Sequence, residues 1–397
     1  MKQGWEIKKL GECFEYIKNG ANIKQERGAG GIPITRIETL SGGVFNRDRL
    51  GYADIETIDK YQSYVMESGD LLLSHINSKS YIGRVVVYVK EGDETIIHGM
   101  NLLRLKVIPD LISPFYMYYY SQTHKFKSQI ANRRKDAVNQ SSISVADLKT
   151  IDVPIPPREE QERIVAELNC LSGIIERKRE QLRELDALAQ SIFYQMFGDP
   201  ITNEKGWEID RLGNMCDISS SKRIYAHEYC EDGIPFYRGK EITEKSKGND
   251  ISVELYIAED RYNELKHKYG VPQIGDILIT AVGTIGNIWV VDNDTPFYFK
   301  DGNVLWLQIK DNINPIYFKT LLYNLIDKYK ESMANGCAYS ALTIVNLKEM
   351  QTNKIPFVLQ QQFAEKIEKT EQQKKLISQS IKEVEDLFNS RMSYYFN

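Results

Sequence analysis

The sequence predicts an α+β protein with two tandem homologous domains, separated by two long α-helices that form an antiparallel coiled coil. The first observation is a repeat: GWEIKKLG at residues 4–11 recurs as GWEIDRLG at 206–213, with six of eight residues identical. The second is a heptad pattern of apolar residues at the end of each half. A chain of 397 residues also exceeds what one hydrophobic core usually supports.

The repeat continues along the chain in one order. The matching pairs are GIPITR (31–36) with GIPFYR (233–238), SGDLLLS (68–74) with IGDILIT (274–280), HGMNLLRL (98–105) with KDGNVLWL (300–307), ISPFYMYY (112–119) with INPIYFKT (313–320), SISVADLK (142–149) with ALTIVNLK (341–348), and VPIPP (153–157) with NKIPF (353–357). This order indicates one duplicated unit. We expect domains at 1–157 and 199–356, a central helix at 158–198 and a C-terminal helix at 357–397.

Both sheet and helix are expected in each domain. Short apolar and β-branched runs bounded by Gly, Asp and Asn predict strands at 70–74, 84–89, 276–280 and 287–291. A longer helical stretch follows in each half and opens at a proline, Pro114 or Pro315. These patterns together predict the α+β class.

The two long helices are predicted from residues spaced alternately by four and three. The expected seam consists of Ile164, Leu168, Leu171, Ile175, Leu182, Leu185, Ile192 and Met196 in the first helix, and of Phe363, Ile367, Ile377, Ile381, Val384 and Phe388 in the second. If a two-fold axis relates the copies, helices that each follow their own domain run antiparallel, giving a pseudo-two-fold dumbbell. Apolar residues beside the seam (Val165, Ile174, Phe193 and Leu376) are expected either as exposed docking positions or as a second seam against the chain's own domains.

Composition and motifs exclude several classes of function. No run approaches the roughly 20 apolar residues that span a bilayer, and five cysteines form no C-x-x-C pair, so we expect a soluble protein of the reducing cytoplasm. The chain lacks a Walker A motif, an F-x-G-x-G loop and a [DN]-P-P-[FYW] tetrapeptide, and its five histidines lack metal-ligand spacing. Asp70 and Asp276 are expected as turn residues that enter strands. No catalytic or metal site is predicted.

Polar and basic side chains in loops are the remaining candidates, because such side chains contact DNA bases and phosphates. The predicted DNA-binding residues are Arg36, Ser78, Lys79, Ser80, Arg84, Asn101, Arg133, Arg134, Lys135, Asn139, Gln140, Lys222, Arg223, Arg238, Thr284, Asn287, Lys300 and Asn303. Arg36 and Arg238 are equally consistent with internal ion pairs, the loops at 78–84 and 284–287 with solvated hairpins, and the 133–135 run with a solvated helix end. The second copy has ANGCAYS (334–340) in place of that basic run, so the two domains are expected to bind differently.

Five sequence features occur in order over essentially the full length: the W-E-I-x-x-L-G opening of each half, the G-I-P-x-x-R segment, the L-K then I-P entry into each helix, the PPREEQERIV helix start and the M-F-G-D-P exit. In these features the chain resembles the specificity (S) subunit of type I restriction–modification enzymes. Each motif alone is weak, but the ordered and duplicated set is specific.

The resemblance implies two target recognition domains, each reading one half of a bipartite asymmetric site in double-stranded DNA. It implies helices that set the unread spacer and dock two modification subunits, which methylate adenine with S-adenosylmethionine. It also implies that restriction subunits supply ATP-driven translocation and Mg²⁺-dependent cleavage, and that this subunit holds no cofactor and performs no chemistry. Because the second domain is net acidic, we expect weak DNA binding by the isolated subunit.

Two alternative functions remain open from the sequence. One is an assembly scaffold whose domains bind protein without DNA readout. The other is a stand-alone nuclease that cuts DNA with Mg²⁺ in the absence of partners.

Overall fold

The chain divides into two units in the computed structural model, which describes residues 4–26, 31–138, 140–334 and 341–396. Unit 1 comprises Met1–Arg179 and Gln379–Asn397, and unit 2 comprises Glu180–Ser378. Each unit therefore contains one part of each long helix. Over the described ranges, no helix combines the length and the apolar character that a membrane crossing requires.

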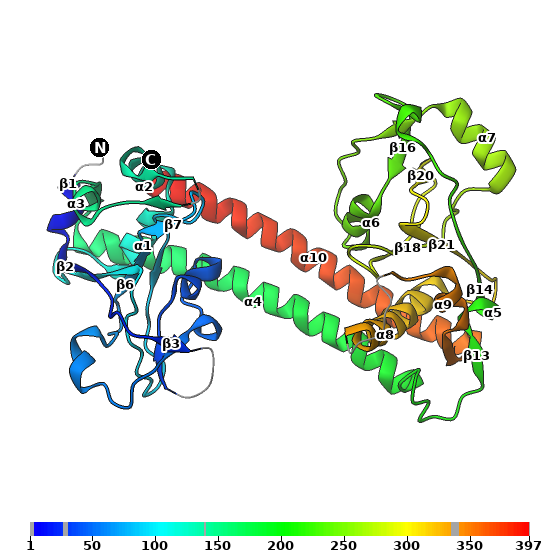
Figure 1. The fold of residues 1–397 in the computed structure, drawn as a ribbon, viewed down its shortest axis with the longest axis horizontal. Helices are drawn as coiled ribbons and strands as arrows, with labels where there is room; N and C mark the ends of the chain where they lie inside the picture. Colours follow the sequence, from blue (N-terminus) through cyan, green and yellow to red (C-terminus); the bar gives the residue numbers. More distant parts are fainter. Residues whose placement is uncertain (1–3, 27–30, 139, 335–340, 397) are drawn as a thin grey trace. The chain divides into compact units, whose positions relative to one another are not determined.

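A four-stranded antiparallel sheet forms the centre of each unit (Figure 1). In unit 1 its order is β2 (Phe14–Asn19), β9 (Leu102–Val107), β6 (Leu71–Ser74) and β8 (Val85–Val87). In unit 2 the order is β14 (Cys216–Ser220), β21 (Val304–Ile309), β18 (Ile277–Thr280) and β19 (Ile288–Val290). The equivalent order confirms the predicted duplication of an α+β unit.

A two-stranded sheet joins the start and end of each recurring segment. In unit 1, β1 (Glu6–Lys9) pairs with β12 (Asp152–Ile155), and in unit 2, β13 (Ile209–Arg211) pairs with β22 (Gln351–Asn353). Ile7 lies opposite Pro154, and Ile209 lies opposite Asn353. The strand register thus makes Pro154 of unit 1 equivalent to Asn353 of unit 2. The sequence match of VPIPP with NKIPF is therefore wrong by one residue, because it aligned Pro156 with Pro356 instead of aligning the strand partners.

Smaller elements complete both units. The further sheets contain β3 (Gln25–Glu26), β5 (Gly51–Ala53) and β4 (Ile32–Ile34); β10 (Lys135–Asp136), β11 (Ser141–Ser142) and β7 (Ile76–Asn77); and β15 (Tyr229–Cys230), β17 (Tyr256–Ile257), β16 (Ile234–Tyr237) and β20 (Tyr298–Phe299). The short helices are α3 (Val145–Lys149), α5 (Leu212–Met215), α6 (Gly239–Ser246), α7 (Glu259–Tyr269) and α9 (Ile344–Glu349), with 3-10 turns η1 (Leu10–Glu12), η2 (Ile37–Gly43), η3 (Arg47–Arg49), η4 (Asp59–Tyr64) and η5 (Ala226–Glu228).

The helical stretch after the sheet differs between the units. Unit 2 has one helix, α8 (Pro315–Ala334), whereas unit 1 has two, α1 (Pro114–Gln122) and α2 (His124–Arg133). Thr123 interrupts the unit 1 helix because its backbone is extended and its hydroxyl accepts a hydrogen bond from the Phe126 N–H at 3.2 Å, which makes it the N-cap of α2. The single helix expected for unit 1 is therefore wrong at this residue.

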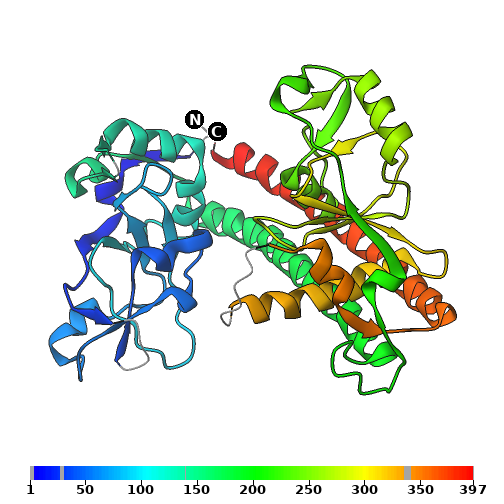
Figure 2. The ribbon, with the colours of Figure 1, turned by 45° about the vertical axis from the view of Figure 1, so that its right-hand side comes forward.

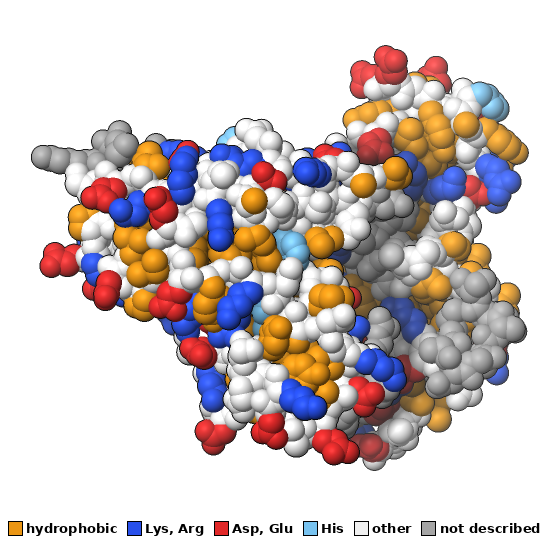
Figure 3. All heavy atoms as spheres, turned by 60° about the vertical axis from the view of Figure 1, so that its left-hand side comes forward, with side chains coloured by type: hydrophobic (Ala, Val, Ile, Leu, Met, Phe, Trp, Pro, Cys, Tyr) orange, Lys and Arg blue, Asp and Glu red, His pale blue; other side chains and the backbone are white. Residues whose placement is uncertain are grey.

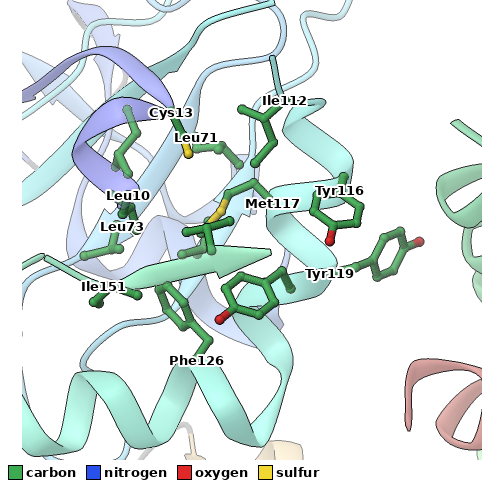
Figure 4. Close-up of a cluster of buried hydrophobic side chains, with 14 of the residues drawn as sticks. Leu10, Cys13, Leu71, Leu73, Ile112, Tyr116, Met117, Tyr119, Phe126 and Ile151 are labelled. Carbon is green, nitrogen blue, oxygen red and sulfur yellow. The ribbon is translucent and has the colours of Figure 1, made fainter. Parts of the chain in front are cut away.

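The core of unit 1 lies between its central sheet and helices α1 and α2. Figure 4 shows Leu71 and Leu73 of β6 gathered with Met117 of α1 and Phe126 of α2, and all four are buried. The buried Cys13 belongs to the same cluster, and burial raises the pKa of its thiol to about 11. Packing, rather than chemistry, is therefore the role of this cysteine.

Two 40-residue helices, α4 (Arg158–Phe197) and α10 (Phe357–Phe396), lie side by side in Figures 1 and 2. In unit 1, Leu168 near the start of α4 shares a core with Phe396 at the end of α10. In unit 2, Phe197 at the end of α4 packs against Phe363 near the start of α10, with ring centroids 5.4 Å apart. Opposite ends thus meet in each unit, which confirms antiparallel pairing.

All predicted seam positions are buried or half-buried. Of the two alternatives for the apolar residues beside the seam, Phe193 follows the second: its side chain is only 1% exposed and stacks on Tyr317 of its own unit. Val165 and Ile174 are half-buried, and Leu376 is 68% exposed. The buried side of α4 shifts by one residue near its end because 3.6 residues per turn drift against a 3.5-residue repeat.

Candidate nucleic-acid interface

Corresponding loops leave the central sheets of both units. Gly83 and Gly286 each donate a backbone hydrogen bond of 2.8 Å to the last residue of a strand, Ser74 or Thr280. Both glycines have positive φ, and a Cβ would lie 2.9 Å from Ile130 at Gly83 and 2.6 Å from Ile326 at Gly286. The two loops are therefore held against equivalent points of the following helices.

Arg84 and Asn287 occupy equivalent positions after these glycines. The Ser74 N–H donates to the Arg84 carbonyl at 2.9 Å, and the Thr280 N–H donates to the Asn287 carbonyl at 3.0 Å. The Arg84 guanidinium donates to the Leu40 carbonyl at 3.2 Å and lies over the exposed Tyr81 ring, whereas the Asn287 amide donates to Thr243 Oγ1 at 3.0 Å. The same backbone frame thus presents different hydrogen-bonding groups.

Three short strands bring distant basic residues of unit 1 together. β11 pairs with both β10 and β7, which places the 78–84 loop beside the 134–136 segment. Lys79 Nζ and Arg134 Nε lie 3.1 and 3.0 Å from the Asp136 carboxylate, which also accepts a hydrogen bond from the Ser141 hydroxyl at 2.6 Å. The hydrogen bond from Ser141, followed by the contacts with Lys79 and Arg134, lowers the pKa of Asp136 to about 2. The carboxylate therefore stays charged and orients both cations.

A groove of about 880 Å³ lies beside these cations, between the 78–84 loop and helices α1, α2 and α10. Its basic lining residues are Lys79, Arg84, His124, Lys127 and Arg134. No aspartate or glutamate is among the described residues that line it. We call this feature the basic groove. Its chemistry suits an anion such as a backbone phosphate.

Other predicted residues of unit 1 are placed differently. Arg133 binds a residue of its own domain, since its Nε donates a hydrogen bond to Thr150 Oγ1 at 2.8 Å. Arg36 is half-buried, its backbone N–H donates to Thr39 Oγ1 at 2.9 Å, and it has no ion pair with any residue of the described ranges. Exposed positions are Ser78, Ser80, Asn101, Lys135 and Gln140, while Asn139 lies outside the described residues.

The equivalent arginine of unit 2 is an internal ion-pair residue. Arg238 Nη2 lies 2.8 Å from Glu241, which is buried, and 2.8 Å from Glu254. The hydrogen bond to Glu241, followed by that to Glu254, raises the pKa of Arg238. Thr39 stands in unit 1 where Glu241 stands in unit 2, which explains why Arg36 and Arg238 differ.

The remaining candidates of unit 2 lie in two places, the 222–223 segment beside Asp301 and the 284–287 loop. Arg223 pairs with Asp301 at 3.0 Å, and Lys222 lies over the Tyr269 ring at 4.7 Å. Thr284 is exposed beside Asn287, whereas Lys300 and Asn303 are half-buried, and their backbone groups bond to the Tyr237 carbonyl and the Ala281 N–H. The structure therefore brings Arg223 beside the turn that carries Lys300, and it brings the 284–287 loop beside Thr243, which sequence reasoning missed.

His124 and Lys127 were also missed in unit 1. They lie three residues apart on α2 and therefore share one helix face, a signal that the sequence contains. Figure 3, in which the left-hand side of Figure 1 comes forward, shows Lys and Arg side chains interspersed with Asp and Glu rather than gathered in one field. In the part of the chain that the structure describes, no group of three or more His, Cys, Asp or Glu residues could hold a metal ion.

Two stretches of the chain, residues 2–186 and 204–386, match the family model of the type I restriction modification DNA specificity domain. The chain belongs to this family. Among its relatives, the specificity subunit named for the type I restriction enzyme MjaX of Methanocaldococcus jannaschii is 29% identical over 376 residues, covering 89% of this chain and 83% of that protein. The EcoKI specificity subunit of Escherichia coli is 24% identical over 191 residues, 47% of this chain and 41% of that protein.

Solved specificity subunits share the fold. The type I restriction–modification S subunit from M. genitalium superposes with a TM-score of 0.58 at 16% identity, over 99% of this chain and 97% of the other. A chain from a structural study of complex assembly in the type I system gives a TM-score of 0.56 at 17% identity, over 100% and 98%. The duplicated units and long helices of this chain thus correspond to the fold of its family.

Proposed function

We propose that each unit reads one half of a bipartite, asymmetric site in double-stranded DNA. The observation that carries the proposal is the equivalence of Arg84 and Asn287, which the same frame presents with different side chains. A guanidinium suits the acceptor edge of guanine, and a side-chain amide suits the paired donor and acceptor of adenine. A duplicated frame with divergent loops is what two different half-sites require.

The basic groove of unit 1 supports the DNA part of the proposal. The lining cations outnumber the Asp136 carboxylate that pairs with two of them, Lys79 and Arg134. Such an excess of positive charge attracts phosphates, which fix register but carry no sequence information. Arg36 adds a further free cation among the described residues, whereas Arg238 is already neutralised. Because the chain carries a net charge of −4, partner subunits supply much of the remaining phosphate neutralisation, and the isolated subunit binds DNA weakly.

The paired helices α4 and α10 fix the length of the unread spacer and dock two modification subunits. Those subunits methylate adenine with S-adenosylmethionine, and restriction subunits add ATP-driven translocation and Mg²⁺-dependent cleavage. In this account the chain itself is a non-catalytic recognition subunit that acts in the cytoplasm. Exposed apolar residues on the helices, such as Leu188 and Leu376, are consistent with a protein partner.

A domain exchange tests the proposal. The chain is assembled with its modification subunit, its residues 1–157 are replaced by the corresponding domain of a relative, and methyladenine is mapped on a DNA library. One half of the methylated motif should change and the other half should remain. An unchanged motif would favour an assembly scaffold, and cleavage by the purified chain with Mg²⁺ alone would favour a nuclease.

A further inference from the structure

The side-chain amide of Asn287 in unit 2 lies between two hydrogen-bond acceptors. Its Nδ2 donates to Thr243 Oγ1 and to the Thr284 carbonyl, each at 3.0 Å. The Thr243 hydroxyl gives its own hydrogen to the Gly239 carbonyl at 2.7 Å, a shorter contact than its 3.4 Å to the Thr284 hydroxyl. Because a hydroxyl has one hydrogen and a carbonyl has none, Thr243 Oγ1 and the Thr284 carbonyl both act as acceptors toward Asn287.

This arrangement determines which end of the Asn287 amide is free. Both hydrogens of Nδ2 are used, and a flipped amide would place its oxygen against two acceptors, so the nitrogen faces the protein. Oδ1 makes no hydrogen bond in the described part of the chain, and it is not one of the buried unpartnered atoms there, so it is open to solvent. The Asn287 side chain therefore offers a ligand an acceptor and no donor.

Thr280 fixes the backbone of the same loop. The Asn287 N–H donates to Thr280 Oγ1 at 3.0 Å, and the Thr280 hydroxyl donates to the Thr284 carbonyl. Thr280 ends β18 and is fully buried. The position of Asn287 is therefore set before a ligand binds, which reduces the conformational entropy lost on binding.

The equivalent Arg84 of unit 1 has the opposite character. A guanidinium carries five N–H donors and no acceptor. Arg84 uses Nη1 for the Leu40 carbonyl at 3.2 Å and lies over the Tyr81 ring, 4.5 Å from its centroid. Leu40 belongs to η2 and Thr243 to α6, the elements that follow the paired G-I-P-x-x-R segments. Each unit thus holds its loop side chain from the same element, but unit 1 presents donors and unit 2 an acceptor.

We propose that the 284–287 loop of unit 2 reads an exocyclic amino group in the major groove, with Asn287 Oδ1 as the acceptor and Thr243 as the residue that positions it. The amino groups of adenine and cytosine are the donors that base pairs present there. A free amide pairs with N6 and N7 of adenine together, but Asn287 has no N–H left for N7. This inference rests on the proposed function and narrows its chemistry, because Asn287 then reads a base as a carboxylate would.

Base analogues test the acceptor readout in the assembled complex with the unmodified chain. Methyladenine mapping with Asn287→Ala first identifies the base pair that this residue reads. In a duplex that carries the motif, purine then replaces adenine at that pair, or pyrimidin-2-one replaces cytosine, which removes only the amino group. Binding titrations should show at least about a tenfold loss of affinity with the unmodified chain and less than about twofold with Asn287→Ala.

A second analogue distinguishes one contact from two. A 7-deazapurine in the same base pair removes N7 and keeps the amino group, so the affinity of the unmodified chain should change by less than about twofold. A loss as large as that on removal of the amino group would show that Asn287 also donates to N7, and it would overturn the acceptor-only readout. An equal loss with the unmodified chain and with Asn287→Ala, when the amino group is removed, would overturn it as well.

Two substitutions test the positioning role of Thr243. Thr243→Val keeps the shape of the side chain and removes the acceptor, so the released amide should allow at least about fivefold more methylation of sites with the wrong base at that pair. Thr243→Ser keeps the hydroxyl, is the matched control and should leave the motif unchanged. Neither variant should change the half-site that unit 1 reads. An unchanged motif with Thr243→Val overturns the positioning role, and where valine lowers the melting temperature, the base analogues decide.

The outcomes also separate this inference from the proposed function. If Asn287→Ala relaxes no base pair, or if removal of the amino group changes nothing, while a bipartite motif is still methylated, the acceptor readout is overturned and the proposed function stands. If the complex assembles and methylates no bipartite motif, both fail.

Discussion

The side-chain carbonyl of Gln161 accepts a hydrogen bond of 2.8 Å from the backbone N–H of Ser113, which ties the start of α4 to the start of α1. Its amide donates to the Leu111 and Pro156 carbonyls at 2.9 and 3.0 Å. Gln360 repeats the contact in unit 2, accepting from the Asn314 N–H at 2.9 Å. Both glutamines are buried, so each joins a long helix to its own domain.

Replacing Gln161 or Gln360 by leucine should lower the free energy of unfolding by about 1–3 kcal/mol each, because a buried backbone N–H loses its acceptor. Urea denaturation followed by circular dichroism measures the change. Gln181→Leu, at an exposed position of α4, is the matched control and should change the free energy by less than about 0.5 kcal/mol. Equal effects at Gln161 and Gln181 would contradict the assigned role.

Arg104 and Trp306 occupy the same position of the central sheet and face equivalent aspartates. Arg104 Nε lies 2.8 Å from the fully buried Asp70 carboxylate, and the Trp306 indole donates to Asp276 at 2.8 Å. Arg104→Met should destabilise the chain by about 3 kcal/mol, because it leaves the buried Asp70 carboxylate with only the Glu67 N–H and Lys106 as partners among the described residues. Trp306→Phe removes the hydrogen bond to Asp276 and should lower the free energy of unfolding by about 1–2 kcal/mol, apart from any packing change. Denaturation of both variants decides whether the arginine effect is larger.

Unit 1 should lose stability in acid, because the pKa of Glu94 is lowered in the folded chain. The pKa of Glu94 is lowered to about 2, chiefly by the hydrogen bonds that Arg47 donates to it at 3.0 and 2.7 Å. The unfolded chain therefore binds this proton more readily than the folded one. The stabilisation is complete above about pH 5 and is lost as the pH falls toward 2. Glu94→Gln should make the free energy of unfolding vary less with pH in this range. An unchanged pH dependence would contradict the role assigned to Glu94.

Each of the two loops should determine the specificity for one half-site. Arg84→Ala should relax the methylated motif in one half-site, with a discrimination loss of about 1–3 kcal/mol at the affected base pair. Asn287→Ala should relax the other half-site and leave the first intact. Methyladenine mapping on a DNA library with the assembled complex measures both. Relaxation of the same half-site by both variants would contradict independent reading.

Lys127 should contribute to DNA affinity without contributing to specificity. Removing one phosphate contact by Lys127→Ala should lower the slope of log affinity against log salt concentration by about 1 and leave the methylated motif unchanged. Binding titrations of the complex at several salt concentrations measure the slope. Lys149→Ala, an exposed lysine that does not line the basic groove, is the control.

The duplicated fold was predictable because matching segments carried the strands and helix starts in one order. Helical drift accounts for the one-residue shift near Phe193, but the sequence could not show what covers that side chain, since Tyr317 lies far away in the chain. It also could not show that the helix of unit 1 breaks at Thr123, where local capping competes with helix continuation.

The candidate site was only partly predictable. Lys79 and Arg134 were named as separate loop residues, but their convergence depends on the pairing of β7, β11 and β10. Arg36 and Arg238 matched in sequence, yet Glu241 in place of Thr39 gives Arg238 an internal partner.

The central claim, that this chain reads DNA twice, is tested most directly by methylome sequencing of a host that expresses it with its modification subunit, compared with the same host lacking the chain. A new bipartite motif with methyladenine in both halves is expected. Absence of any new motif, with the complex confirmed to assemble, would contradict it.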